Sequence, residues 1–161
     1  FEVDRWIAAG AMRVVVHMDS IEFDAFLELA RTVEMKGVEM VLGFATTSSF
    51  EKLKKYIDAV EDANNPINQG KHRKVINWVQ CMGIEKIGFQ AQPFDARVLE
   101  NIKKIKEMYP SMLVSVDGGV NLNTAAQLVE AGADRLVVGS ALFTSDSISD
   151  TLVKISNTFN A

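Results

Sequence analysis

Val114-Ser-Val-Asp117-Gly118-Gly119-Val is an apolar strand that ends in an aspartate and two glycines, and Leu136-Val-Val-Gly139-Ser140 repeats the plan further along the chain. Glycine has no Cβ and adopts positive φ at little steric cost, so its backbone N–H can approach a phosphate closely. Two glycine-bearing strand ends indicate a phosphate site at the carboxyl ends of parallel strands, as in a barrel of alternating strands and helices.

Strands and helices alternate along the rest of the chain. Apolar runs rich in β-branched residues predict strands buried on both faces, and apolar residues at helical spacing predict the helices between them. The predicted strands are 12–18, 38–44, 75–82, 113–116 and 135–138. The predicted helices are 6–10, 23–37, 50–60, 95–108, 124–131 and 148–159, and residues 63–74 predict a polar loop. Repeated βα units of this kind build a parallel sheet in an α/β fold.

One junction occurs twice. Residues 9–16 (Ala-Gly-Ala-Met-Arg-Val-Val-Val) match residues 131–138 (Ala-Gly-Ala-Asp-Arg-Leu-Val-Val). Both stretches predict a helix that ends at a glycine and leads directly into a strand. Either an internal repeat or convergent packing of one kind of unit explains the match.

Composition excludes several classes of function. The chain has 161 residues, of which 48% are apolar and 24% charged, and a net charge of −4. With no basic tract, nucleic acid is not an expected partner, and no apolar run reaches the roughly 20 residues of a membrane span. The single cysteine, Cys81, favours a core position and a cytoplasmic location. The chain starts inside a predicted helix without an initiator methionine, so we expect it to be cut from a longer protein or incomplete.

The motifs together resemble the ribulose-phosphate 3-epimerase family of ribulose-phosphate-binding TIM barrels. They are Asp4-Arg-Trp-Ile, the strand ending in His17, Gly-Phe-Gln-Ala-Gln-Pro-Phe at 88–94, Val-Asp-Gly-Gly-Val-Asn at 116–121, Glu-Ala-Gly-Ala at 130–133 and Val-Gly-Ser-Ala-Leu-Phe at 138–143. The resemblance implies a small phosphorylated sugar as the partner. It implies that the phosphate is held by Gly118, Gly119, Gly139 and Ser140, and that the substrate loop includes Gly88, Gln90 and Gln92. Gln90 and Ala91 stand where the family has glycines, which hinders a close backbone approach.

The resemblance also implies metal-assisted proton transfer. In the family a divalent metal (Zn, Mn or Fe) polarises the ketose, and two aspartates move the C3 proton. The metal ligands are these aspartates and two histidines on the second, third and seventh strands. Residues 12–18 correspond to the fourth strand, so Asp117 is the one member of this set in the chain, as both catalytic residue and metal ligand.

Other polar residues have structural interpretations. His17 is expected to be a structural histidine at a strand end, and Asp19 a cap for a helix beginning near Ile21. Asp95 is a candidate cap for the next long helix. Asp117 and its glycines have the alternative role of shaping a turn, and Gly139 and Ser140 that of capping the last helix.

Five βα units leave an unpaired strand at each edge of the sheet. Strands that are apolar on both faces do not stay exposed to water at such edges. The missing strands lie in a parent protein, or two chains associate edge to edge, or the sheet relaxes into a flavodoxin-like open form. We predict a single domain over residues 1–161, a partial TIM barrel completed as a homo-oligomer, with the flavodoxin-like sheet as the alternative.

The leading hypothesis for function is an epimerase of phosphorylated ketoses, or its inactive remnant, in which Asp117 moves a proton at the carbon next to a ketone. The second is a non-catalytic module that binds a phosphorylated ligand or serves assembly. The third is a related barrel decarboxylase or synthase, because the Asp-x-Lys-x-x-Asp motif of those families belongs to a strand outside this chain.

Overall fold

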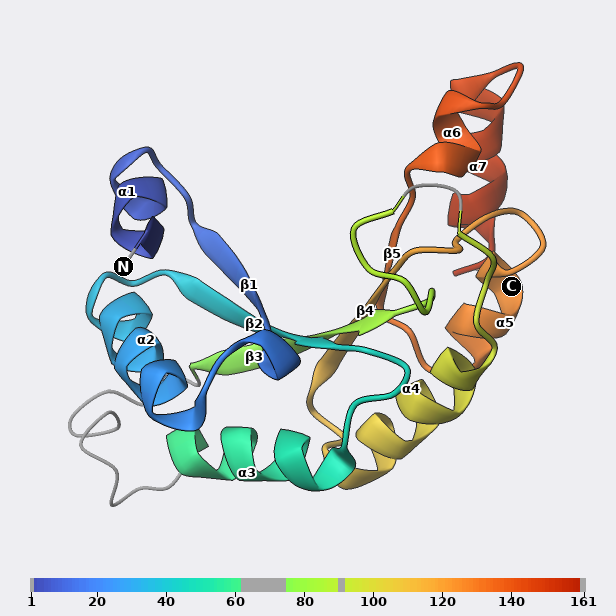
Figure 1. Ribbon diagram of the computed structural model, residues 1–161. Helices are drawn as coiled ribbons and strands as arrows, with labels where there is room; N and C mark the ends of the chain where they lie inside the picture. The colour runs from blue at the N-terminus through green and yellow to red at the C-terminus, as the bar shows by residue number, and fades with distance from the viewer. Residues whose placement is uncertain (1, 62–74, 90–91, 160–161) are drawn as a thin grey trace. The chain divides into compact units, whose positions relative to one another are not determined.

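The computed structural model describes residues 2–61, 75–89 and 92–159, in which strands and helices alternate (Figure 1). The strands are β1 Arg13–His17, β2 Glu39–Phe44, β3 Ile76–Met82, β4 Leu113–Asp117 and β5 Arg135–Val137. The helices are α1 Glu2–Ala8, α2 Phe23–Met35, α3 Phe50–Glu61, α4 Arg97–Met108, α5 Ala125–Glu130, α6 Ser140–Phe143 and α7 Ile148–Asn157. The predicted strands all form, and the loop predicted over 63–74 lies outside the described residues.

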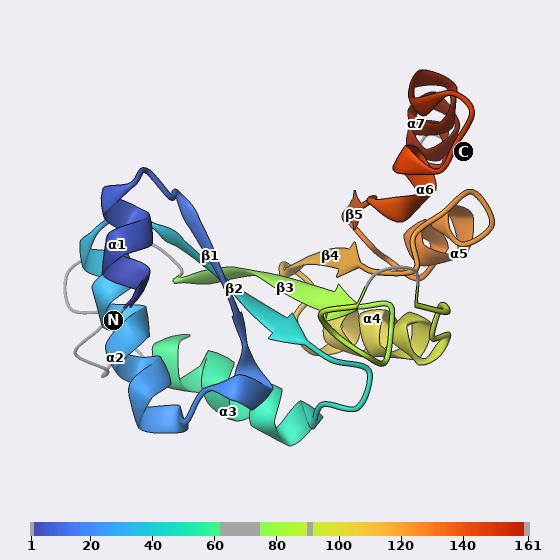
Figure 2. The same cartoon turned by 45° about the horizontal axis from the view of Figure 1, so that its top comes forward.

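The strands form one parallel sheet in the order β1-β2-β3-β4-β5, which can be followed in Figure 2. In the outer pairs, Arg13 lies opposite Glu39 and Ser115 lies opposite Arg135. A flavodoxin-like sheet has the order 2-1-3-4-5, whereas strands of a TIM barrel follow one another in chain order. The flavodoxin-like alternative is therefore wrong, and the barrel-like interpretation is confirmed.

The chain divides into two compact units, and β3 contributes to both. Unit 1 is Phe1–Phe44 with Ser48–Val79, and unit 2 is Ala45–Thr47 with Gln80–Ala161. We describe each unit by itself, and the single-domain prediction stays a prediction. No helix among the residues described in either unit has the length and apolar character that crossing a membrane requires.

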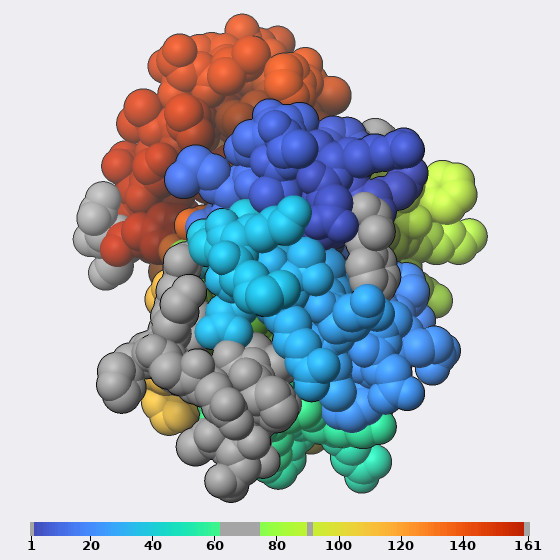
Figure 3. Space-filling model, turned by 90° about the vertical axis from the view of Figure 1, so that its left-hand side faces the viewer, coloured from blue at the N-terminus to red at the C-terminus, as the bar shows by residue number. Residues whose placement is uncertain are grey.

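In unit 1, helices α2 and α3 cover β2. The core side chains are fully buried: Phe26, Met40, Leu42, Leu53 and Ile57. The rings of Phe26 and Tyr56 join the two helices at 4.5 Å between centroids. Helix α1 is held by the ion pair between Asp4 and Lys36, 2.7 Å long. Figure 3 shows the dark-blue residues of α1 and the lighter blue residues of α2 on the same face. Helix α1 spans Glu2–Ala8 and ends before Gly10, in line with a chain that starts within a helix and with a glycine that ends it.

In unit 2, helix α4 packs against β4, and both α4 and α5 contribute buried side chains. Val114, Val116, Ile102, Ile105 and Leu128 have no exposed surface. Cys81 on β3 is also fully buried, as predicted, and burial raises the pKa of its thiol to about 12. At neutral pH this thiol is protonated, so its part is packing rather than nucleophilic chemistry.

The outer strands differ from the prediction. Both were expected to be buried on two faces, yet Val15 on β1 is 40% exposed and Val137 on β5 is 39% exposed. Met12, just before β1, is 83% exposed. Within the described part of the chain, each outer strand pairs with a neighbour on one side only. Apolar side chains typical of a fully covered strand are therefore exposed on β1 and β5.

The repeated junction has the same geometry in both places. Gly10 has φ 101° and Gly132 has φ 110°, the left-handed conformation of a helix-ending glycine. The N–H of Ala11 donates to the carbonyl of Trp6 at 3.0 Å, and the N–H of Ala133 donates to Leu128 at 3.0 Å. The prediction of two helix–glycine–strand junctions is confirmed.

Candidate active site

Asp117 is the last residue of β4, and its backbone is fixed by the loop that follows β3. The N–H of Gly83 donates to the Asp117 carbonyl at 2.8 Å. A Cβ at Gly83 would lie 2.2 Å from the carbonyl oxygen of Gly118, and a Cβ at Gly119 would lie 2.9 Å from the carbonyl oxygen of Gly83. Gly118 and Gly119 also have positive φ, 93° and 68°. The glycines therefore allow two loops to touch beside Asp117, a structural role that sequence had offered as the alternative to phosphate binding.

The loop beyond these glycines is held by side chains. Thr124 Oγ1 and Asn121 Nδ2 both donate to the Gly119 carbonyl, at 2.8 and 3.1 Å. The N–H of Asn121 donates in turn to Thr124 Oγ1 at 2.9 Å. These bonds fix the direction of the backbone between Gly119 and α5, so its amide groups are preorganised.

The Asp117 side chain has a partner that the sequence analysis did not identify. Gln80 Nε2, on β3, donates to Asp117 Oδ2 at 3.1 Å, and both residues are only partly exposed. The sequence signal for this contact was a glutamine inside the otherwise apolar stretch Val79–Met82. Sequence alone does not say which neighbouring strand end such a side chain meets.

The second glycine-bearing strand end lies next to Asp117. Asp117 is the register partner of Val137 on β5, so Gly139 and Ser140 follow the strand adjacent to β4. Both are exposed, and a Cβ at Gly139 would meet no atom within 4 Å. They begin the separate one-turn helix α6, whereas Ser147 caps the last helix α7 by accepting from the N–H of Asp150 at 3.2 Å. The alternative that Gly139 and Ser140 cap the last helix is therefore wrong.

The candidate substrate loop is anchored close to Asp117. Its ends are tied together, because the N–H of Asp95 donates to the Gly83 carbonyl at 2.9 Å. Gly88 is exposed with φ 89°, and Gln92 is partly exposed. Gln90 lies outside the described residues, so its predicted role stays a prediction.

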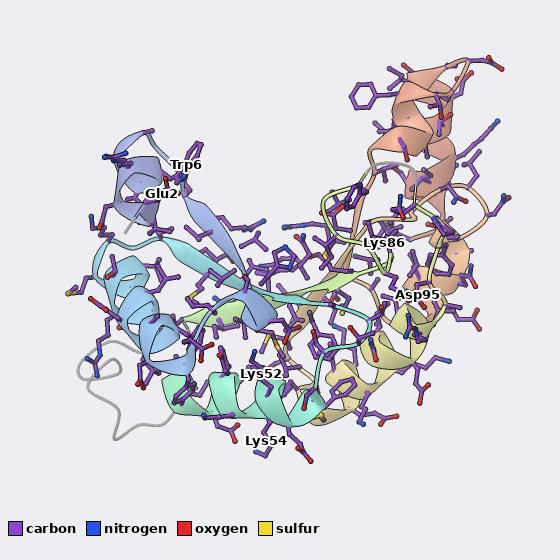
Figure 4. All side chains as sticks on the ribbon, in the orientation of Figure 1. Glu2, Trp6, Lys52, Lys54, Lys86 and Asp95 are labelled. Atoms are coloured by element: carbon purple, nitrogen blue, oxygen red, sulfur yellow. The ribbon has the colours of Figure 1, made fainter. Side chains whose placement is uncertain are left out.

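Asp95, labelled in Figure 4, lies two residues before α4, whose N-cap position is occupied by Ala96. The Asp95 carboxylate accepts from the N–H of Arg97, the first residue of the helix, at 3.1 Å, so it satisfies a helix-start N–H from a position one residue before the cap. The Arg97 guanidinium lies 2.6 Å from the same carboxylate and lowers the pKa of Asp95 to about 2. The Asp95 carboxylate therefore has a structural role at the start of α4.

The strand end of unit 1 carries His17 and Asp19. The His17 ring packs against Gly43, where an added Cβ would lie 2.6 Å from Nδ1, in line with a structural histidine. Asp19 does not cap α2, because the short 3₁₀ helix Met18–Ser20 intervenes and α2 begins at Phe23. It accepts instead from the Ser48 hydroxyl and from Lys52 Nζ, the latter at 3.3 Å; Figure 4 labels Lys52 on α3.

The described residues do not fit a divalent metal by themselves. Among residues 2–61, 75–89 and 92–159, no group of three or more His, Cys, Asp or Glu side chains comes together in a way that holds a metal ion. Asp117 has a neutral amide as its side-chain partner. A metal at Asp117 would need further ligands from beyond these residues.

Comparison with known proteins gives a family for the sequence. The model of the ribulose-phosphate 3 epimerase family matches residues 1–143. The ribulose-phosphate 3-epimerase of Aquifex aeolicus is 29% identical over 146 residues, covering 88% of this chain and 57% of that protein. The cytoplasmic isoform of Oryza sativa subsp. japonica is 27% identical over 135 residues, covering 84% and 53%. The chain thus spans a little over half the length of these relatives.

Solved structures agree on the fold. A 3-hexulose-6-phosphate synthase from Salmonella typhimurium superposes with a TM-score of 0.70 at 17% identity, covering 99% of this chain and 67% of that one. A 3-keto-L-gulonate-6-phosphate decarboxylase from Vibrio cholerae gives 0.67 at 12% identity, with 99% and 66% covered. These neighbours are TIM barrels, and at such identities the likeness concerns the fold alone.

Proposed function

The chain belongs to the ribulose-phosphate 3-epimerase family, and on this premise we propose that it acts as an epimerase of a phosphorylated ketose. Asp117 is the proposed proton-transfer residue. The observation that carries the proposal is the placement of Asp117 at the end of β4, opposite Val137 and therefore beside the glycine-bearing end of β5. A carboxylate and two glycine strand ends are adjacent at the face of the sheet where parallel-strand enzymes bind substrates.

The proton-transfer step uses the acidity of a carbon next to a ketone. Asp117 takes the C3 proton, the C–H electron pair forms the C2–C3 double bond, and the π pair of the C2 carbonyl moves onto its oxygen to give an enediolate. Inversion requires a proton to return to the opposite face of C3, so a second donor takes part and Asp117 supplies one of two transfers. A positioned acid or base of this kind typically contributes about 10²–10⁴-fold to the rate.

The phosphate is proposed to bind at Gly118, Gly119, Gly139 and Ser140. Support comes from the fixed amide directions after Gly119 and from the open space at Gly139. A Cβ at Gly139 would meet no described atom within 4 Å, so packing among the described residues leaves room there for a ligand to approach the backbone. Gly88, Gln90 and Gln92 are proposed to contact the sugar.

Further proposals concern the implied metal, self-association and location. The family resemblance implies a divalent metal (Zn, Mn or Fe), but the described residues supply no ligand set, so no step is assigned to it. The exposed apolar residues of β1 and β5 favour self-association that covers both edges. We also propose a cytoplasmic location, by analogy with the rice isoform.

The test is turnover of D-ribulose 5-phosphate by the purified chain, with light scattering to give its oligomeric state. Calorimetry of inorganic phosphate binding to the parent chain and to Gly139→Ala tests the proposed phosphate site separately. Turnover that depends on Asp117 supports the proposal. Absence of turnover contradicts it, and phosphate affinity without turnover then favours the non-catalytic binding module.

The related decarboxylase or synthase is the second candidate, because solved structures of both kinds share the fold. Sequence relatives favour the epimerase, since the curated matches carry that name. Release of CO₂ or formaldehyde from a phosphorylated sugar acid or hexulose, without change at C3 of ribulose phosphate, would favour the second candidate.

A further inference from the structure

We propose that Gln80 is a positioning residue for Asp117, an inference that rests on the proposed function. Its side-chain amide donates a hydrogen bond to Oδ2 of the Asp117 carboxylate. Oδ1 is then left as the atom that exchanges a proton with the substrate. The bond between Gln80 Nε2 and Asp117 Oδ2, 3.1 Å long, is the observation behind it.

The orientation of the Gln80 amide follows from its partner. A carboxylate is an acceptor only, and an amide offers two N–H donors on nitrogen and lone pairs on oxygen. Turning the amide over would place two acceptor oxygens against each other. The nitrogen therefore faces Asp117, and the pair is a donor–acceptor contact in which the glutamine sets the angle of the carboxylate.

Asp117 is held at two points that lie on different parts of β3 and its loop. The Gly83 N–H fixes the Asp117 backbone carbonyl at 2.8 Å, and Gln80 fixes one side-chain oxygen. Val79 and Cys81, the neighbours of Gln80 along the strand, have no exposed surface. A side chain that projects from so well-packed a strand has little freedom, which suits a positioning role.

The partner of the Asp117 side chain is neutral. Among the described residues, no cation forms an ion pair with Asp117, and the amide of Gln80 restricts rotation of the carboxylate without adding a charge.

The test uses Gln80→Met, which keeps the length of the side chain and removes the donor. Its control is Gln127→Met on α5, a partly exposed glutamine whose side chain makes no hydrogen bond among the described residues. With D-ribulose 5-phosphate, we expect Gln80→Met to lower kcat about 10-fold, the loss of one hydrogen bond to a charged group, with KM and the urea midpoint near those of the parent. The control keeps the parent kcat.

A second readout does not need activity. In a ¹H–¹⁵N spectrum of the chain, the side-chain amide signal of Gln80 is expected to shift on Asp117→Asn, whereas that of Gln127 stays in place. If Asp117→Asn stops turnover but Gln80→Met leaves kcat unchanged, or the Gln80 signal does not move, this inference is overturned and the proposed function stands. If the parent has no turnover, the proposed function fails, and the positioning role fails with it.

Discussion

Two aspartates follow strands in this molecule, and they have opposite surroundings. Asp19, after β1 in unit 1, accepts from the Ser48 hydroxyl and from the Lys52 ammonium. Asp117, at the end of β4 in unit 2, accepts from one neutral amide. The partners of Asp19 are a hydroxyl from the loop before α3 and a cation from the first turn of α3, so Asp19 links the end of β1 to the start of that helix.

The comparison shows that two carboxylates at similar positions relative to a strand can differ in whether an oxygen is left available for chemistry. Each carboxylate lies at or just after the carboxyl end of its own strand, the kind of position at which parallel-strand barrels carry their functional residues. In Asp19 both oxygens are engaged, whereas Asp117 keeps Oδ1 without a bond among the described residues. We therefore expect only Asp117 to take part in proton transfer.

The largest expected effect is on turnover. Asp117→Asn removes the proposed base and keeps the shape of the side chain, so kcat for D-ribulose 5-phosphate should fall by about 10²–10⁴-fold. The matched variant is Asp19→Asn, which removes an exposed ion pair worth about 0–1 kcal/mol of stability and should leave kcat within about threefold. An equal loss of kcat in the two variants would contradict the contrast between the two strand ends.

The second-largest expected effect is on stability, and it compares a glycine of unit 2, Gly83, with a glycine of unit 1, Gly43. Both Gly83 and Gly43 have φ outside the left-handed region. A Cβ at Gly83 would meet the backbone oxygen of Gly118 at 2.2 Å, whereas a Cβ at Gly43 would meet the His17 side chain, which can turn away. Gly83→Ala should lower the free energy of unfolding by about 1–3 kcal/mol, and Gly43→Ala by less than about 1 kcal/mol. Urea unfolding of the two variants measures this, and the reverse order would refute the loop contact.

A smaller effect is expected on ligand affinity. Gly139→Ala adds a methyl group where the described residues leave open space, so it should disturb a bound phosphate more than the fold. Loss of one amide–phosphate hydrogen bond predicts an affinity about 10-fold weaker, measured by calorimetry with ribulose 5-phosphate. Unchanged affinity would remove Gly139 from the phosphate site.

The smallest effect is on the pH dependence of stability. The folded-state pKa of Asp95 is lowered to about 2, first by its hydrogen bond with Arg97. A lowered carboxyl pKa contributes stability above the unfolded-state value near 4, which is lost as pH falls from there through about 2. Arg97→Gln should therefore reduce stability slightly at pH 7 and show a flatter decline between pH 4 and 2, because solvent screens this exposed pair.

The control for this pH effect is Lys54→Gln on α3, which makes the same charge change at an exposed ion pair with Asp58; Figure 4 labels Lys54. Urea midpoints at several pH values separate the variants. If Arg97→Gln and the parent decline in parallel below pH 4, the Asp95–Arg97 pair is not the cause of the acid sensitivity.

Sequence patterns predicted the elements well where periodicity was sustained. The apolar run of β2 and the helical spacing of α4 predicted elements whose bounds differ from the observed ones by about two residues or fewer. Burial of β1 was mispredicted, because an apolar run carries no information on whether a neighbouring strand is there to cover it. The short helix α6 was missed, since four residues are too few to show a period.

The candidate site was only partly accessible from sequence. The motif around Asp117 and the one around Gly139 come from adjacent strands, as a parallel sheet in chain order predicts. Gln80 and Gly83 were not identified, because their roles depend on which atoms of β4 and its loop they meet. The role of Asp19 was mispredicted for the same reason, since its partner Ser48 comes from the loop before α3 and its partner Lys52 from the first turn of α3.

The most direct test of the central claim is hydrogen exchange at C3 of D-ribulose 5-phosphate in D₂O, followed by ¹H NMR. A base that removes the C3 proton exchanges it with solvent, whether or not inversion is complete. The parent chain is expected to replace the C3 proton with deuterium, and Asp117→Asn to abolish that exchange while Asp19→Asn retains it. Exchange that is absent in the parent, or that persists in Asp117→Asn, would contradict the account.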